Sequence, residues 1–294
     1  MTFADAIESL PPLRQVIKDA SLSAKKSLGQ NFILDLNVTR RIARAAGPLD
    51  NVTVLEIGPG PGGLTRGLIL EGAAGVVAIE RDERFAPALA QIEAHSAGRF
   101  KPLFMDALEA DYPKLGAETG ARRIVANLPY NIATPLIVGW LSGERWPPWF
   151  DKLVVMVQRE VADRLVAECG TGHYGRLSVL AQYRTRPRML FAVPPGVFTP
   201  PPKVSSAIVE IAPQPEPPDA VPVALLSEVT AAAFGQRRKM LRSSLAALGV
   251  DTPGLLAAAH IDPSLRAERL TVTDFLRLAQ CLQALRDRSG RQPK

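Results

Sequence analysis

Short runs rich in β-branched residues alternate with helical stretches through the first part of the chain, and this rhythm constrains the fold most. The runs are VTVLEIG (52–58), GVVAIE (75–80), RFKPLFMD (99–106), RRIVANL (122–128) and KLVVMVQ (152–158). Strands separated by helices indicate a parallel sheet with right-handed crossovers. The later runs RPRMLFAVP and SSAIVEIAP predict an antiparallel pair at the sheet edge. The expected class is therefore α/β and Rossmann-like, with a mostly parallel sheet.

A proline-rich stretch, APQPEPPD (212–219), divides the chain, because its prolines can continue neither a helix nor a strand ladder. Beyond it, apolar residues recur at helical spacing in VALLSEVTAAAF, RKMLRSSLAAL and TDFLRLAQCLQAL. We predict an N-terminal catalytic domain over 1–213 and a small all-α domain over 214–294.

Composition limits the partners and the compartment. Lys and Arg number 35 against 29 Asp and Glu, a net charge of +6 that permits a polyanionic partner. The two cysteines are too few for a disulfide framework, and the three histidines never fall at metal-ligand spacing. No run approaches the roughly 18 apolar residues of a membrane span. We expect a cytoplasmic protein without a metal or a membrane partner, and a monomer.

The stretch EIGPGPGGLT (56–65) follows the first strand and opens a helix, and its glycines fit G-x-G-x-x-G. Glycines such as Gly58 let the backbone turn sharply beside a ligand, and the helix N-terminus offers free N–H groups. A dinucleotide and S-adenosylmethionine both fit this pattern, and both expect an acid at the end of the second strand to bind a ribose diol. Glu80 stands there.

Two further acids favour S-adenosylmethionine. Glu56 precedes the glycines, where a carboxylate repels a pyrophosphate but suits a cofactor that carries an ammonium and a sulfonium. Asp106 ends the third strand and can accept a hydrogen bond from the cofactor's adenine amino group.

The fourth strand ends in Asn127-Leu128-Pro129-Tyr130, over the crevice where such folds bind ligands. The exocyclic amine of adenine is a poor nucleophile, and two acceptors can bias it toward tetrahedral geometry by holding its N–H bonds. The Asn127 side-chain oxygen and the Leu128 carbonyl are the candidates, since Pro129 keeps Leu128 extended. Tyr130 offers a face on which the base can stack. Such a scheme needs no general base.

Basic clusters suggest phosphate contacts. Arg184, Arg186, Arg188 and Lys203 lie in a segment without acids, Arg237, Arg238, Lys239 and Arg242 cluster at a helix start, and Lys25 and Lys26 lie near the N-terminus. An unpaired adenosine in an RNA loop is also cheaper to splay into a pocket than a paired one.

These motifs together resemble the adenine-N6 dimethyltransferases of small-subunit ribosomal RNA. The resemblance rests on KKSLGQNFILD (25–35), the glycine loop, VANLPYNIATP, MVQREVADRLVA, YGRLSVLAQY, VFTPPPKVSSAIV and FGQRRKMLRSSL. It implies methylation of N6 on two adjacent adenosines in the loop of the 3′-terminal hairpin of that RNA, within a pre-ribosomal small subunit.

The resemblance also assigns roles to residues. Asn31, Ile33, Gly58, Glu80, Asp106 and Asn127 would contact the cofactor. Tyr130 and Phe198 would sandwich the target base, although a Phe in a proline-rich loop can equally plug the core.

Three other functions remain open at this point. An adenine methylase of large-subunit RNA or DNA would share the cofactor site. A nucleic-acid-binding or assembly factor without activity could keep the fold, although the intact acids and Asn-Leu-Pro-Tyr argue against it. A nicotinamide oxidoreductase is disfavoured by Glu56 and by the lack of a hydride-transfer set.

Overall fold

The computed structural model describes residues 3–19, 29–215 and 221–289. Contacts within the chain group it into two compact units. Unit 1 comprises residues 1–140, 148–162 and 188–213, and unit 2 comprises residues 141–147, 163–187 and 214–294.

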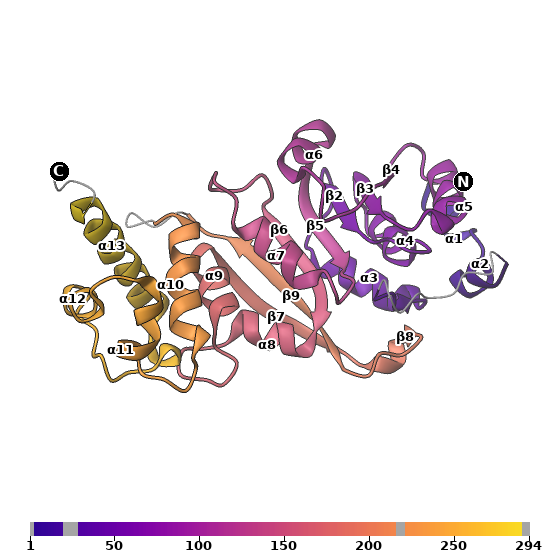
Figure 1. The fold of residues 1–294 in the computed structure, drawn as a ribbon. Helices are drawn as coiled ribbons and strands as arrows, with labels where there is room; N and C mark the ends of the chain where they lie inside the picture. Colours follow the sequence, from indigo (N-terminus) through magenta and orange to yellow (C-terminus); the bar gives the residue numbers. More distant parts are fainter. Residues whose placement is uncertain (1–2, 20–28, 216–220, 290–294) are drawn as a thin grey trace. The chain divides into compact units, whose positions relative to one another are not determined.

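A seven-stranded sheet forms the framework (Figure 1). Its strands are β2 (Thr53–Ile57), β3 (Gly75–Glu80), β4 (Phe100–Phe104), β5 (Ala121–Asn127), β6 (Lys152–Gln158), β7 (Thr185–Val193) and β9 (Ser206–Pro213), in the order β4-β3-β2-β5-β6-β9-β7. The first five are parallel, whereas β9 runs antiparallel to β6 and β7 forms the edge. The predicted strands and the mostly parallel sheet with an antiparallel addition are confirmed.

The central strands are apolar on both faces. In β6, residues 153–157 are all buried, and in β5 residues 124–126 are buried. Such continuous burial is typical of a parallel sheet covered on two sides, and it explains why these runs do not alternate between apolar and polar residues.

Helices precede, connect and follow the strands of unit 1. They are α1 (Phe3–Glu8), α2 (Leu13–Asp19), α3 (Leu36–Ala45), α4 (Gly63–Leu70), the short η2 (Glu83–Phe85), α5 (Ala86–His95), α6 (Tyr112–Thr119), α7 (Ala133–Leu141) and the first half of α8 (Arg159–Val166). Helix α4 packs closely on α3: a Cβ added at Gly67 would lie only 2.9 Å from the Thr39 backbone.

A second, two-stranded sheet joins distant parts of the sequence. Strand β1 (Phe32–Ile33) pairs antiparallel with β8 (Phe198–Thr199), which follows the short η3 (Pro195–Val197). Strands of two residues carry no periodic signal, so the sequence alone did not reveal them. This pairing brings the GQNFI motif beside the VFTPPPKV motif.

Unit 2 contains α9 (Arg176–Arg184), α10 (Val223–Gly235), α11 (Leu241–Ser244), η4 (Leu245–Leu248), α12 (Thr252–Ala258), η5 (Ala267–Arg269) and α13 (Val272–Ser289). Residues 141–147 and 163–187 belong to it, whereas the sequence placed them in the first domain. The reason is that α9 packs on α10 and α13, and the Tyr183 hydroxyl hydrogen-bonds the backbone of Val221. Their position before the proline-rich stretch had suggested that they belong to the first domain.

Candidate active site

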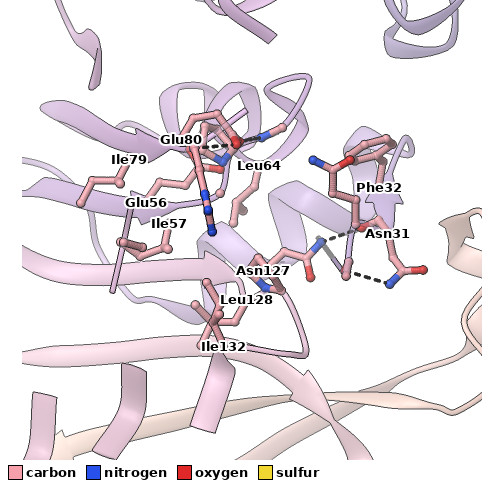
Figure 2. A pocket seen from close by; sticks show the side chains of 18 of the residues that line it. Asn31, Phe32, Glu56, Ile57, Leu64, Ile79, Glu80, Asn127, Leu128 and Ile132 are labelled. Atoms are coloured by element: carbon pink, nitrogen blue, oxygen red, sulfur yellow. Dashed lines mark hydrogen bonds between the residues drawn. The ribbon is translucent and has the colours of Figure 1, made fainter. Parts of the chain in front are cut away.

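A pocket opens where β2, β3, β4 and β5 end, beside the point at which the strand order reverses (Figure 2). Open α/β sheets bind ligands at this position. Eight of the nine site residues predicted from the sequence line it: Asn31, Ile33, Gly58, Glu80, Asp106, Asn127, Leu128 and Tyr130. Phe198 is the exception.

The glycine loop between β2 and α4 forms one wall. Gly58, Gly60 and Gly62 have φ values of 67°, 55° and 87°, which residues other than glycine rarely adopt. A Cβ at Gly60 would also lie 3.2 Å from the Phe32 ring. The sharp turn therefore lets the backbone itself line the pocket.

Glu80 closes β3 and is only 6% exposed. Its Oε2 accepts from the Gly60 amide at 3.0 Å, and its Oε1 accepts from the amides of Arg81 and Asp82 at 2.9 and 2.8 Å. Burial raises the pKa of Glu80, and these amide donors oppose that rise. Because a carboxylate offers about four acceptor sites, one remains for a hydroxyl donor such as a ribose diol.

Glu56, on β2, is almost completely buried, and the Thr65 hydroxyl donates to its Oε2 at 2.6 Å. Burial raises the pKa of Glu56 to about 8, with the Thr65 bond opposing the rise and the charge of Glu80 adding to it. The carboxyl therefore holds its proton at neutral pH, which the sequence argument did not foresee. A cation placed beside it would favour ionisation, which preserves the preference for a sulfonium or an ammonium.

Asp106 follows β4 and already has partners. Its Oδ1 accepts from the Leu108 amide at 2.9 Å, and its Oδ2 pairs with Arg81 Nη1 at 3.0 Å. Met105, which precedes it, also lines the pocket and is 40% exposed, and Leu108 shortly after it is 50% exposed. An exposed apolar patch beside an acceptor suits a planar base with an amino group. Sequence reasoning found Asp106 but missed these apolar neighbours.

Asn127 lies at the end of β5 with its side chain at the pocket. Its Nδ2 donates to the Asn31 carbonyl at 3.0 Å, as Figure 2 shows. A carbonyl can only accept, so this contact fixes which end of the amide is nitrogen. The Oδ1 is left as an acceptor to which no described residue donates.

Leu128 places a second acceptor next to the first. Its side chain is buried, and its amide donates to the Met156 carbonyl at 3.3 Å, which extends the ladder between β5 and β6. No described residue donates to the Leu128 carbonyl. Two neighbouring acceptors at one pocket wall can hold both hydrogens of an amino group.

Tyr130 lines the pocket and is anchored by a 2.6 Å hydrogen bond between its hydroxyl and the Ser206 hydroxyl. Burial raises the pKa of Tyr130. Phe198 is only 3% exposed and packs in the core beside Ile33, its partner across β1 and β8. Its stacking role stays a prediction.

The pocket chemistry fits S-adenosylmethionine. Two acids at successive strand ends, a glycine turn and a further buried acid suit a ribose, an adenine and a cationic centre. Among the described residues that line the pocket, Arg81 is the one basic side chain that could face a pyrophosphate. Within the described ranges, no group of three or more His, Cys, Asp or Glu could hold a metal ion.

Comparisons with known proteins agree with this geometry. The profile of the ribosomal RNA adenine dimethylase family matches residues 21–284. The chain belongs to this family. Ribosomal RNA small subunit methyltransferase A of Rhodopseudomonas palustris (strain HaA2) is 59% identical over 96% of this chain and 98% of its own length. The protein of the same description from Xanthobacter autotrophicus is 55% identical over 97% and 98%. The members are adenine dimethyltransferases, and this chain is an enzyme of that class.

Solved structures show the same fold. A dimethyladenosine transferase from Plasmodium falciparum superposes with a TM-score of 0.67 and 24% identity, covering 83% of this chain and 94% of that one. The 23S rRNA methyltransferase ErmE gives 0.63 and 25%, covering 86% and 100%. The Rossmann-like methyltransferase fold is thereby confirmed.

The basic residues predicted to contact RNA divide into two groups. Arg184 is buried, and its Nη1 donates to the carbonyls of Leu141 and Gly143. Arg188 pairs with Glu210 at 2.5 Å. The prediction for Arg184 is wrong, because its guanidinium is buried on these carbonyls. That for Arg188 stays a prediction, because its side chain is 68% exposed and it shares Glu210 with Lys152.

Other basic residues remain exposed, including Arg186, Lys203, Arg238, Lys239 and Arg242. Arg237 is also exposed, but its Nη2 donates to the carbonyls of Gly172 and Tyr174. Lys25 and Lys26 lie outside the described residues. None of the helices in the described ranges combines the length and apolar character needed to cross a bilayer.

Proposed function

We propose that this chain transfers methyl groups from S-adenosylmethionine to N6 of two adjacent adenosines in the loop of the 3′-terminal hairpin of small-subunit ribosomal RNA. The reaction would take place in the cytoplasm on a pre-ribosomal small subunit. The names of the relatives support the substrate class, and the sequence motifs support the position. The observation that carries the proposal is the Asn127 amide, whose nitrogen is held by Asn31 while its oxygen stays at the pocket.

Each pocket residue has its own role in the proposed methyl transfer. When bound, S-adenosylmethionine supplies a methyl group on a positively charged sulfur, which keeps the bonding electron pair when the methyl leaves. Asn127 Oδ1 and the Leu128 carbonyl accept the two N6 hydrogens, so the nitrogen lone pair turns out of the ring plane and becomes nucleophilic. Tyr130 stacks on the base. The alkylated amine loses its proton readily, so orientation and polarisation provide the catalysis.

Asn127→Ala tests this role directly. We expect the single-turnover rate to fall by roughly 100-fold or more, since a transition-state acceptor is removed, while cofactor affinity changes little. Asn127→Asp keeps the acceptors but cannot donate to Asn31, so it should also be slow. Asn37→Ala, an exposed change on α3, is the control. A variant that loses cofactor affinity but keeps its rate would refute the assignment.

Methylation assays on isolated ribosomal subunits test the substrate. We expect methyl incorporation into small subunits only, and mass spectrometry should locate it on two adjacent adenosines. Incorporation into large subunits would favour the alternative methylase. Absence of S-adenosylmethionine binding in calorimetry would favour an assembly factor without activity.

A further inference from the structure

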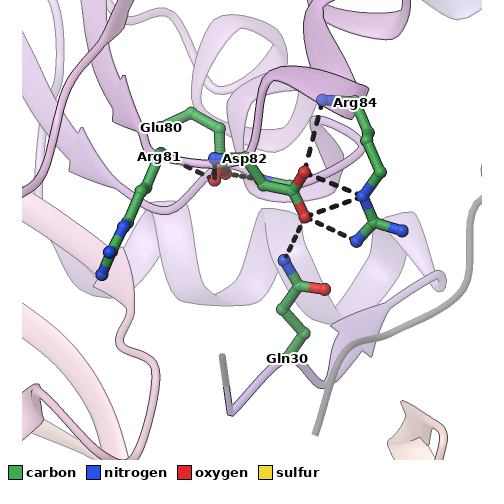
Figure 3. Close-up of polar contacts among 6 residues, drawn as sticks. Gln30, Glu80, Arg81, Asp82 and Arg84 are labelled. Atoms are coloured by element: carbon green, nitrogen blue, oxygen red, sulfur yellow. Dashed lines mark hydrogen bonds and ion pairs between the residues drawn. The ribbon is translucent and has the colours of Figure 1, made fainter. Parts of the chain in front are cut away.

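A polar network beside the pocket joins residues that the proposed mechanism does not use (Figure 3). Its centre is Asp82, two residues after the end of β3, whose side chain is 5% exposed. Arg84 grips this carboxylate with Nε at 2.8 Å from Oδ1 and Nη2 at 2.5 Å from Oδ2. A bidentate pair of this kind fixes the plane of a carboxylate as well as its position.

Asp82 is also fixed through its backbone. Its amide donates to Glu80 Oε1 at 2.8 Å, so the residue is held at both ends. A buried, doubly anchored carboxylate is a rigid acceptor. Gln30 hydrogen-bonds to this acceptor: its Nε2 donates to Asp82 Oδ2 at 3.1 Å, although the two residues are 52 positions apart in the sequence.

Gln30 immediately precedes Asn31, the residue whose carbonyl holds Asn127. On the other side of Asn31, the Phe32 ring packs edge-on against Phe85 with centroids 5.5 Å apart. The Asn31 carbonyl therefore lies between two anchored neighbours. The Phe32 contact alone would anchor Asn31 on one side only. The residue before Gln30 is Gly29, a flexible link with a φ of 63°, so the side chain of Gln30 has to supply the anchor on the other side.

We propose that Gln30 and Asp82 are positioning residues for methyl transfer: their hydrogen bond holds the Asn31 carbonyl, and that carbonyl orients the Asn127 amide toward the target amine. This inference rests on the proposed role of Asn127. Arg84 contributes by keeping Asp82 ionised and in place, and it lowers the pKa of Asp82.

The network separates two effects. The side chain of Asp82 acts on the Gln30–Asn31–Asn127 series, whereas its backbone amide acts on Glu80. A side-chain substitution leaves the backbone amide in place. Because Asn31 is also a predicted cofactor contact, changes in this network should weaken cofactor binding somewhat but slow the reaction at saturating cofactor by a larger factor.

A swap of partners tests the proposal. Gln30→Glu sets two carboxylates against each other, and Asp82→Asn removes one acceptor oxygen, so each should lower kcat about 10- to 100-fold through misplacement of Asn127. In the Gln30→Glu/Asp82→Asn double variant, the amide introduced at position 82 can donate to the carboxylate introduced at position 30, so the hydrogen bond forms again with its direction reversed. We expect kcat to recover to within about threefold of the parent, a coupling that a double-mutant cycle measures.

Two further measurements separate positioning from general damage. In every variant, the calorimetric Kd for S-adenosylmethionine should rise by a smaller factor than kcat falls. Amide hydrogen exchange over residues 29–33 should accelerate in both single variants and return in the double variant, which tests positioning without any activity. Gln30→Ala, which leaves Asp82 and Arg84 intact, is the milder variant and should give the same pattern.

Matched controls are Glu83→Gln and Gln91→Glu, which make the same charge changes at exposed positions nearby. The proposal fails if the single variants keep their kcat, if the double variant shows additive losses, or if hydrogen exchange is unchanged. A Kd change confined to the Gln30 variants would instead make Gln30 a direct cofactor contact and would also overturn it. Loss of the proposed function looks different, because the unaltered chain would then fail to methylate small subunits.

Discussion

At the scale of single residues, hydrogen bonding decides what each pocket side chain can do. Asn127 can present its oxygen only because a backbone carbonyl occupies its nitrogen. Three backbone amides donate to the Glu80 carboxylate, and one oxygen of Asp106 forms an ion pair with Arg81. Each acid therefore reaches the pocket with a defined number of acceptor sites left.

Glu56 should make stability depend on pH. Its pKa is about 8 in the folded chain against about 4.5 in an exposed carboxyl. Between these values the folded chain holds a proton that the unfolded chain releases, so the free energy of unfolding falls as pH rises, by up to about 1.4 kcal/mol per pH unit.

Glu56→Gln should remove this slope, because Gln can still accept from Thr65 but does not ionise. Urea unfolding at several pH values from about 5 to 8 measures the effect. Glu109→Gln changes an exposed carboxyl and should keep the slope. Identical slopes in Glu56→Gln and the unaltered chain would show that Glu56 is ionised throughout.

At the scale of elements, close packing places the pocket walls. Helix α4 carries the end of the glycine loop and lies against α3 through Gly67. Gly63 is similarly close to β1, since a Cβ there would lie 2.7 Å from the Ile33 carbonyl. Backbone-to-backbone contacts of this kind cannot relax by a change of rotamer, so these positions require glycine.

Gly67→Ala should destabilise the fold by about 1–3 kcal/mol through overpacking against Thr39. Gly139→Ala is a matched comparison, because Gly139 lies in α7 with open space around a Cβ. That change should stabilise by about 0.5–1 kcal/mol through helix propensity. Chemical denaturation of both variants gives the comparison, and equal effects would contradict the packing argument.

At the scale of the whole molecule, the net charge of +6 is compatible with a polyanionic partner, but only part of the basic charge is available to one. Arg184 is buried and Arg188 pairs with Glu210, whereas Arg238 and Lys239 in unit 2 are exposed and form no ion pair with any described residue.

Replacing Arg238 and Lys239 by Ala should weaken binding to small-subunit RNA. The slope of log K against log salt concentration should also become shallower, by about 0.7–0.9 for each phosphate that the variant no longer neutralises. Filter binding at several salt concentrations measures this. Arg288→Ala, an exposed change on α13, is the control, and an unaltered slope in the double variant would remove this cluster from the RNA interface.

The sheet strands, the glycine turn and the acids that follow successive strands could be predicted from the sequence, because period, turn chemistry and strand ends are local properties. Family motifs added Asn31 and Ile33. Folding sets what depends on contacts between distant residues: the proton on Glu56, the burial of Phe198 and Arg184, the pairing of β1 with β8, and the grouping of residues 163–187 with the C-terminal helices. It also joined Gln30 to Asp82 and Asn31 to Asn127. Desolvation and long-range hydrogen bonds arise only when the chain folds, so no local sequence pattern could predict them.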